Sequence, residues 1–287
     1  MPLYIDPERI SLSDHPYAAQ AARRIEDFYD TLFDAAIHYD ENALNHLLSF
    51  GREPNETHLG LSSSRSCGRG TSPEIVLPII REMLRKRLFD SGLITELSDL
   101  QLWTPNFGPD RLSDLTTNII RDVLYDFTLE QYEALGIPLS DESQTQVAWN
   151  PQSHRWEQYA FPKLCANRHQ VLLVPKDFVG RNMLSSPGEL LQKYALSYRQ
   201  KEHLDERSHL CRRRTDRYGR ETWTKPTKKE LRQIEVIGQS EKEYLLRLGY
   251  RHPQMVHELH ADNRRSSCFM RDEDLDYLLY FQRDNVI

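Results

Sequence analysis

The sequence predicts a mixed α+β fold in which a small central sheet is flanked by helices, with helical N- and C-terminal parts. Three observations predict this class. Apolar residues recur at helical spacing near both ends, two short segments in the middle alternate as in a β-hairpin, and one run of four consecutive apolar residues is typical of a buried strand. We expect a mixed core domain over residues 1–185 and a mostly helical, basic region over 186–287, which can pack on that core.

The N-terminal half is expected to begin with helices. Residues 16–50 carry apolar side chains at helical spacing, and a second helix is expected over 73–89, with Pro73 in its first turn. A strand is expected around residues 100–104, followed by a helix over about 114–128.

Strand patterns concentrate in the middle of the chain. The segments "TQVAWN" (145–150) and "RWEQYAFP" (155–162) predict a hairpin joined by "PQSH". The run Val171–Val174 predicts a strand buried on both faces. Helices are expected near 228–248, near 254–260 and at the C-terminus.

Composition and charge limit the classes of function. The 287 residues carry a net charge of −6, so no global charge attracts nucleic acid. The four cysteines are far apart and form no CxxC pair, which is typical of reduced thiols. Because the N-terminus has no basic segment before an apolar run, and no stretch is apolar enough to cross a bilayer, we expect a cytoplasmic protein without a membrane partner.

The segment "GPDRLSDLTTNII" (108–120) is the first place where chemistry is expected. Asp110 and Asp114 offer the carboxylate oxygens that Mg²⁺ prefers, and nucleases use such an ion to activate water. Lys176, at the end of the expected strand 171–174, can stabilise charge that develops at phosphorus. We therefore expect Asp110 and Asp114 to hold Mg²⁺, with Lys176 beside them.

This arrangement resembles the PD-(D/E)xK nuclease core, in which Pro109-Asp110 would supply the first acid. The resemblance implies a second acid two residues before the lysine, but that position is Val174. Glu157, on the neighbouring expected strand, is the substitute for it. The resemblance thus implies a catalytic set of Asp110, Asp114, Glu157 and Lys176.

A structural explanation of the same segment is equally open. Asp114 can cap a helix over 115–127, and Asp110 can fix the turn after Pro109. Thr117 and Asn118 continue a polar face on an otherwise apolar helix, so that face either lines a site or meets solvent.

Two further segments are expected to contact anions. "SSSRSCGRGTSPE" (62–74) is a glycine-containing loop that opens a helix, where Arg65 and Arg69 add positive charge. Segment 199–232 has 12 Lys/Arg and 6 Asp/Glu, so the remaining chain carries about −12. The expected nucleic-acid contacts of that segment combine cations with an aromatic residue: Arg212, Arg213, Arg214, Arg220, Trp223 and Lys225. Plain solvated loops are the alternative for both segments.

Histidines gather in "RHPQMVHELHAD" (251–262). His257 and His260 are spaced to face one way on a helix, beside Glu258 and Asp262, and His252 precedes them. Such pairs bind transition metals, but HExxH is absent, so surface histidines are the alternative.

Three quoted segments, "LGLSSSRSCGRG", "GPDRLSDLTTNII" and "FPK…VLLVPKDFV", resemble uncharacterised bacterial proteins associated with mobile-element or phage-defence loci, over about residues 25–200. Because such loci are rich in nucleases and toxic effectors, the resemblance implies a function of that kind, and it allows for a protein partner in a defence complex.

The functional expectation is therefore a metal-dependent nuclease or nuclease-like effector that acts on nucleic acid in anti-phage defence. The alternative is a non-catalytic nucleic-acid-binding or partner-binding subunit of a defence complex. A hydrolase that uses Asp114 as general base on a small nucleotide is a third option.

Overall fold

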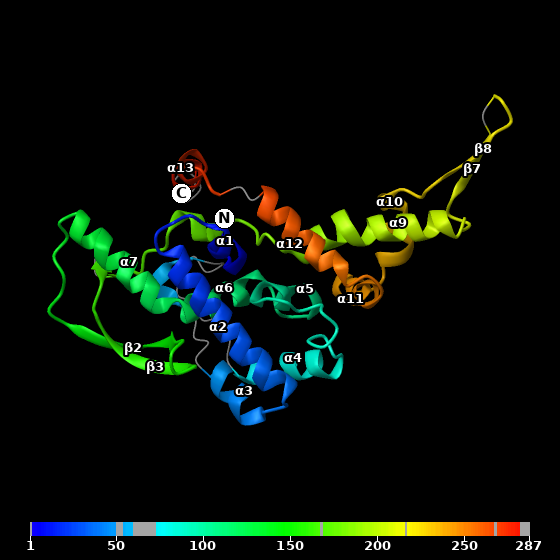
Figure 1. The fold of residues 1–287 in the computed structure, drawn as a ribbon. Coiled ribbons are helices and arrows are strands. Elements are labelled where there is room, and N and C mark those ends of the chain that lie inside the picture. The colour runs from blue at the N-terminus through cyan, green and yellow to red at the C-terminus, as the bar shows by residue number, and fades with distance from the viewer. Residues whose placement is uncertain are drawn as a thin grey trace.

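The computed structural model describes residues 2–49, 54–59, 73–166, 169–215, 217–266 and 269–281, and it confirms the mixed α+β class. Helices form most of the structure (Figure 1). In the described part of the chain the strands form four separate two-stranded antiparallel sheets. The sheet content is therefore divided among hairpins and short pairs, where a small central sheet was expected.

The N-terminal part is a strand followed by four helices: β1 (Tyr4–Ile5), α1 (Pro7–Leu12), α2 (Ala18–Ile37), α3 (Glu41–Leu48) and α4 (Pro73–Arg85). The long helix α2 buries one apolar face, as its spacing predicts. Strand β1 pairs with β6 (Val179–Gly180), which brings the N-terminus against the middle of the chain.

Short helical segments occupy the region where a strand was expected. The short turn η1 (Asn55–Thr57) lies between α3 and α4, and after α4 the chain forms η2 (Leu97–Asp99), α5 (Leu100–Trp103), α6 (Pro109–Ile119) and α7 (Arg121–Ala134). The predicted strand at 100–104 is thus wrong. A capping box formed by Glu96 and Asp99 starts a helical turn, and the side chains of Leu100, Leu102 and Trp103 are all buried.

The predicted hairpin is confirmed as β2 (Ser143–Asn150) and β3 (Arg155–Pro162). Trp149 and Trp156 lie opposite each other in this hairpin and pack their rings against Phe28 of α2. The indole N–H of Trp149 donates to Asp27 (2.7 Å), and that of Trp156 donates to the carbonyl of Leu47 (2.8 Å). These contacts hold the hairpin on the N-terminal helices.

The predicted strand at 171–174 is wrong. The adjoining sheet consists only of β4 (Cys165–Ala166) and β5 (His169–Gln170). Beyond β5 the backbone N–H groups bond to separate parts of the chain. The N–H of Leu172 donates to the carbonyl of Glu56, and that of Leu173 donates to the hydroxyl of Thr128. This stretch precedes η3 (Lys176–Phe178) without forming a ladder.

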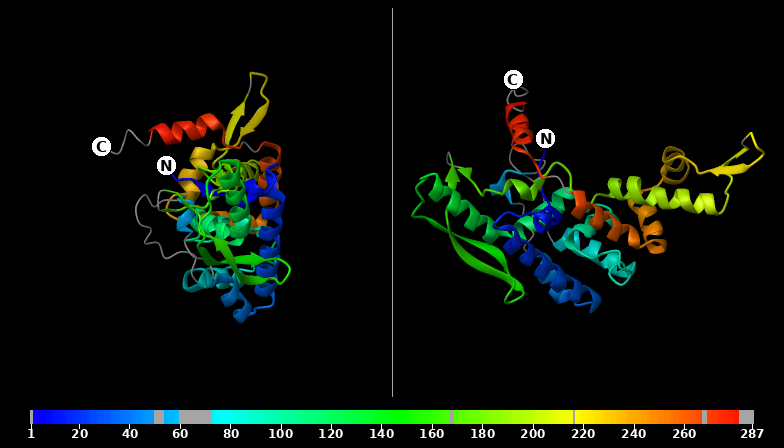
Figure 2. Two further views of the ribbon diagram at one scale, coloured as in Figure 1. Left: turned by 90° about the vertical axis from the view of Figure 1, so that its left-hand side faces the viewer. Right: turned by 45° about the horizontal axis from the view of Figure 1, so that its top comes forward.

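The C-terminal part is helical apart from one hairpin. Its elements are α8 (Pro187–Glu189), the π-helical turn η4 (Leu190–Ala195), α9 (Leu196–Asp205), β7 (Arg212–Thr215), β8 (Glu221–Thr224), α10 (Lys228–Leu231), the π-helical turn η5 (Arg232–Val236), α11 (Glu241–Arg251), α12 (Gln254–Ser266) and α13 (Asp272–Phe281). The β7–β8 hairpin extends away from the other elements in every view (Figures 1 and 2).

The C-terminal helices are joined to the first half by polar contacts. Lys242 of α11 donates from its ammonium to the carbonyls of Thr104 (2.7 Å) and Phe107 (2.8 Å). His260 of α12 contacts Glu8 of α1 and Asp99 of η2. In the described part of the chain, no helix combines the length and the apolar character needed to cross a membrane.

Candidate functional site

Helix α1 carries the first residue of the candidate site, Glu8. The chain enters α1 through Asp6, whose carboxylate accepts the backbone N–H of Glu8 (3.0 Å) and that of Leu184 (2.7 Å), and Pro7 takes the first helical position. The cap fixes the start of the helix, and Glu8 is only 4% exposed. A glutamate is rarely so deeply buried unless it has partners.

The turn η2 supplies two more carboxylates. One oxygen of Asp99 accepts the N–H of Thr95 (2.7 Å), the hydroxyl of Thr95 (2.9 Å) and the N–H of Glu96 (3.2 Å). These three donors hold Asp99 rigidly, and its other oxygen is left for a different partner. Glu96 accepts a hydrogen bond from the hydroxyl of Ser98 and reaches the same region.

Helix α12 brings the histidine. Its buried face carries the apolar side chains of Met255, Val256 and Leu259, and it also carries His260 and Asn263. Because buried polar groups must find hydrogen-bonding partners, this face needs polar groups opposite it. Glu8, Asp99 and Glu96 meet that need.

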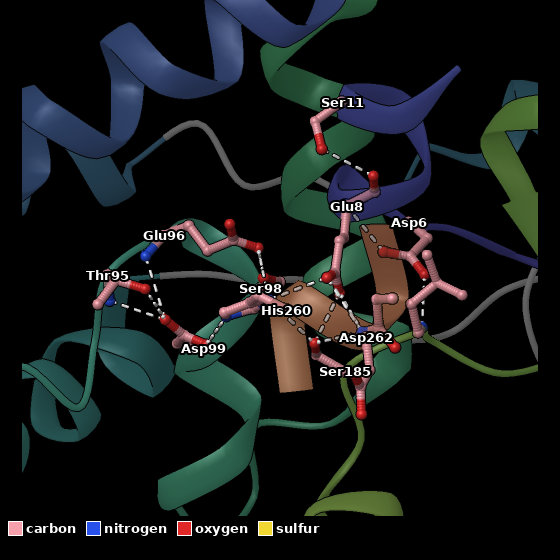
Figure 3. A network of polar contacts seen from close by, with 12 residues as sticks. Asp6, Glu8, Ser11, Thr95, Glu96, Ser98, Asp99, Ser185, His260 and Asp262 are labelled. Atoms are coloured by element: carbon pink, nitrogen blue, oxygen red, sulfur yellow. Dashed lines mark hydrogen bonds and ion pairs between the residues drawn. The ribbon is translucent and has the colours of Figure 1, made fainter. Parts of the chain in front are cut away.

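The three carboxylate side chains surround His260 (Figure 3). Its Nδ1 lies 2.9 Å from Oε1 of Glu8 and 3.6 Å from Oε1 of Glu96, and its Nε2 lies 2.9 Å from Oδ1 of Asp99. Among the residues that the structure describes, Glu8, Glu96 and His260 are the only group of three His, Cys, Asp or Glu side chains whose ligand atoms all lie within 4.8 Å of one another. We call Glu8, Glu96, Asp99 and His260 the carboxylate–histidine centre.

Uncharged donors also hydrogen-bond to the carboxylate of Glu8. The hydroxyl of Ser185 donates to Oε2 (2.6 Å), and the amide of Asn263 lies 3.0 and 3.1 Å from the two oxygens. The backbone carbonyl of Ser185 is in turn bound by the amide of Gln101 (2.6 Å). Glu8 is therefore held by two parts of the chain that are distant from it in sequence, Ser185 and helix α12.

The charges of the centre depend on one another. Burial alone would lower the pKa of His260, but its hydrogen bonds to Asp99 and Glu8 outweigh burial and raise that pKa to about 11. Burial, together with the neighbouring carboxylates of Asp99 and Glu8, raises the pKa of Glu96 to about 7, although His260 opposes the shift. One cationic imidazolium thus holds several carboxylates together.

A cavity of about 410 Å³ adjoins this centre. Glu8 and Glu96 form part of its wall, and the side chain of Glu96 is 37% exposed. Glu26, Asp30 and Arg264 are the other charged residues that line it. The cavity is therefore acidic, and it connects the centre with space large enough for a small molecule.

Helix α6 carries Asp110 and Asp114, the expected Mg²⁺ ligands, one turn apart. The helix begins at Pro109, so Asp114 lies in its interior and the expectation that Asp114 caps the helix is wrong. The backbone carbonyl of Asp114 accepts the amide of Asn118 (2.8 Å). The side chains of Thr117 and Asn118 are buried and bond to their own helix, and Asn118 also accepts from Arg121.

Glu157 and Lys176, the other two expected catalytic residues, have partners of their own. Glu157 accepts the amide of Asn150 (2.7 Å) and the hydroxyl of Ser153 (2.6 Å) within the hairpin. Lys176 donates to Asp272 of α13 (2.7 Å). Among the described residues, Asp110, Asp114, Glu157 and Lys176 do not form a cluster of possible metal ligands like that of Glu8, Glu96 and His260. The catalytic role of these four expected residues therefore stays a prediction.

The expected nucleic-acid contacts between residues 212 and 225 lie on or next to the exposed β7–β8 hairpin, and we call this hairpin with its flanking residues the basic arm (residues 207–229). All four residues of β7 are exposed, and Arg213 lies directly opposite Trp223 on β8. Arg220 and Lys225 are exposed as well, whereas Trp223 is half-buried. Arg65 and Arg69 lie outside the described residues.

Ion pairs and ring contacts organise the basic arm. Arg212 pairs with Glu230 and Arg213 pairs with Glu221. The guanidinium of Arg207 lies 5.9 Å from the centre of the Trp223 ring. Tyr218, near the tip, is 71% exposed. The basic arm therefore presents cations and an aromatic ring to solvent along two paired strands.

Helix α12 places the two members of the expected histidine pair, His257 and His260, in different environments. His260 is buried, but His257 is exposed, and His252 lies 2.7 Å from a carboxylate oxygen of Glu202. Sequence reasoning therefore selected His260 with the wrong companions. Its actual partners, Glu8 and Asp99, are separated from it by 252 and 161 positions.

Comparison with protein-family models gives a match over the N-terminal part of the chain. A family model described as "Domain of unknown function (DUF8370)" matches residues 1–186, which is more than half of the chain. No curated protein and no solved structure matches the chain. The matched region includes Glu8, Glu96 and Asp99, whereas His260 lies beyond it. By this match, the chain belongs to the DUF8370 family.

Proposed function

We propose that the protein binds nucleic acid through the basic arm. The observation that carries this proposal is a two-stranded ribbon that extends from the molecule and exposes Arg212, Arg213, Arg214, Arg220 and Lys225. Lysine and arginine neutralise phosphates, and a two-stranded ribbon fits the major groove of a duplex.

The charge of the basic arm is separated from the rest of the chain. Segment 199–232 carries a net charge of +6 within a chain of net charge −6, so the remaining surface repels a polyanion while this segment attracts it. A polyanion is therefore directed to one end of the molecule.

Aromatic groups favour nucleic acid over a simple acidic protein. Tyr218 is largely exposed beside Arg217, whose guanidinium lies 4.8 Å from the ring centre. Trp223 lies opposite Arg213 on the same face of the ribbon. Exposed rings beside cations stack on bases and hold the adjoining phosphates.

The proposal is tested by the salt dependence of binding. A variant that changes Arg212, Arg213 and Arg214 to Gln is compared with the parent by fluorescence anisotropy on labelled duplex DNA, single-stranded DNA and RNA. For a duplex we expect weaker binding and a plot of log affinity against log salt whose slope is smaller by about 2 to 3, because each lost phosphate contact removes about 0.9.

The matched control changes three consecutive cations to Gln: Arg85, which ends α4, and the following Lys86 and Arg87. It should retain the affinity and slope of the parent. Equal losses in both variants would mean that general charge, and not the basic arm, attracts the nucleic acid. Failure of the parent to bind any of the three probes would refute the proposal.

Metal-dependent cleavage of nucleic acid is the second candidate. The observation that favours it is a group of three metal-ligating side chains, Glu8, Glu96 and His260, beside a cavity. The same probes, incubated with Mg²⁺ or Mn²⁺ and analysed for fragments, test it. Cleavage that survives Glu96→Gln but is lost in Asp114→Ala would place the chemistry at Asp110 and Asp114 instead.

A further inference from the structure

We propose that Glu8, Glu96 and His260 bind one divalent first-row transition-metal ion, such as Zn²⁺ or Mn²⁺, at the wall of the acidic cavity. This site is independent of nucleic-acid binding, because it lies on α1, η2 and α12 and contains no residue of the basic arm.

The spacing of the donor atoms fits one ion. Nδ1 of His260 lies 2.9 Å from Oε1 of Glu8 and 3.6 Å from Oε1 of Glu96. Two donors that each lie about 2.1 Å from an ion are roughly 3 to 3.5 Å apart. Small side-chain adjustments are therefore sufficient to place an ion among the three atoms.

The surroundings of His260 orient it as a ligand. Its Nε2 lies 2.9 Å from Asp99, whose other oxygen is occupied by three donors from residues 95 and 96. An ion at this position would displace the Nδ1 proton of the imidazolium, and the N–H that stays on Nε2 would donate to Asp99, so that the Nδ1 lone pair would face the ion. A carboxylate behind a histidine is the usual support of a metal-bound imidazole.

The cavity supplies access and open coordination positions. Glu96 is partly exposed to it, whereas Glu8 and His260 are buried behind, so an ion would enter past Glu96. Glu26 and Asp30 line the same cavity and attract a cation toward this opening. Three protein ligands leave at least one position for water.

The donor set distinguishes among ions. Mg²⁺ prefers oxygen ligands and octahedral geometry, whereas an imidazole nitrogen beside carboxylates suits Zn²⁺, Fe²⁺ or Mn²⁺. We therefore assign this site to a transition metal, although Mg²⁺ was the ion expected at Asp110 and Asp114.

The test is calorimetric titration of chelator-treated protein with Zn²⁺ and with Mn²⁺, without nucleic acid. We expect one equivalent to bind per chain, and the Glu96→Gln variant to bind at least about ten-fold more weakly. Mg²⁺ at millimolar concentration should not displace the bound ion. Glu96→Gln is chosen because Glu96 is partly exposed, so its replacement should leave the fold intact, which far-ultraviolet circular dichroism checks.

The matched control is Glu26→Gln, which removes a carboxylate from the same cavity without removing a proposed ligand. It should bind the ion within about three-fold of the parent. Absence of binding by the parent, equal affinity in Glu96→Gln, or equal losses in both variants would overturn the site. In the first case the centre is only a buried ion network that joins α1, η2 and α12.

Discussion

Glu235 holds together the two ends of the chain segment from which the basic arm extends. Helix α9 leads into the arm and the turn η5 follows it, and Glu235 of η5 accepts hydrogen bonds from α9 at Arg199 (2.9 and 2.7 Å) and His203 (2.7 Å). The hydroxyl of Tyr244 also donates to it (2.7 Å). We predict that Glu235→Gln lowers the free energy of unfolding by about 2 kcal/mol.

The magnitude follows from the contacts and their exposure. Removing one partner of a fully buried ion pair costs about 3–5 kcal/mol. Glu235 and Arg199 are each 17% exposed, and Arg199 keeps a second carboxylate partner in Glu202, so water and Glu202 reduce the cost. Gln also retains one oxygen that can accept a hydrogen bond from Tyr244.

Urea unfolding followed by tryptophan fluorescence measures this loss, with Glu241→Gln as the matched control. Glu241 pairs with Arg232, but the two side chains are 38% and 47% exposed, and exposed pairs contribute about 1 kcal/mol or less. Equal losses in the two variants would refute the argument that burial and multiple donors make Glu235 the stronger anchor.

The pH dependence tests the same reasoning independently. Burial alone would raise the pKa of Glu235, but the hydrogen bonds from Arg199, His203 and Tyr244 outweigh it and lower that pKa to about 2. Because the folded pKa is below the ordinary value, the stabilisation is complete above about pH 4.5 and is lost as the pH falls toward 2. The stability gap between the parent and Glu235→Gln should therefore narrow between pH 5 and pH 3, and a constant gap would contradict this assignment.

Two further predictions concern packing and charge at α11. A Cβ at Gly249 would lie 3.1 Å from the ring of Trp103. Gly249→Ala should therefore lower the free energy of unfolding by about 1 kcal/mol, even though Ala has the higher helix propensity. In the control Gly188→Ala, the new Cβ meets no atom within 4 Å and should not destabilise the protein, and thermal unfolding compares the two variants. Burial lowers the pKa of Lys242 to about 8, so the folded state releases this proton earlier than the unfolded chain as the pH rises. Relative to Lys242→Met, the parent should therefore gain up to about 2 kcal/mol between pH 8 and pH 10 in urea unfolding, and no gain would show that the ammonium is not destabilised by burial.

Periodicity predicted the elements whose burial is regular. The face of α2 that packs on the core repeats every three to four residues, and the β2–β3 hairpin shows its turn and its two tryptophans in the sequence. Both signals are local, because the residues that define them are close in the chain.

Short apolar runs misled the prediction because they fit two structures equally well. Leu100, Leu102 and Trp103 are buried as a helical turn, since the capping box of Glu96 and Asp99 starts a helix before them. Residues 171–174 belong to none of the strands that the structure describes, and the N–H groups of residues 171, 172 and 173 bond to Leu164, Glu56 and Thr128. A pattern of side chains does not report whether a partner strand is present.

The carboxylate–histidine centre was missed for a different reason, and helix α12 shows what signal was available. His260 and Asn263 lie on the face that also carries Met255, Val256 and Leu259, so the apolar spacing of α12 already indicated that both polar residues would be buried. A buried histidine and a buried asparagine must have polar partners, and these had to come from elsewhere in the chain. Glu8 offered the matching local signal, since it lies in the first turn of the capped helix α1, where it is buried together with Pro7 and Ile10. Helices α1 and α12 thus each carry polar side chains on an otherwise apolar, buried face, and these side chains can bind one another. A search for spaced histidines within one helix instead pairs His260 with the exposed His257.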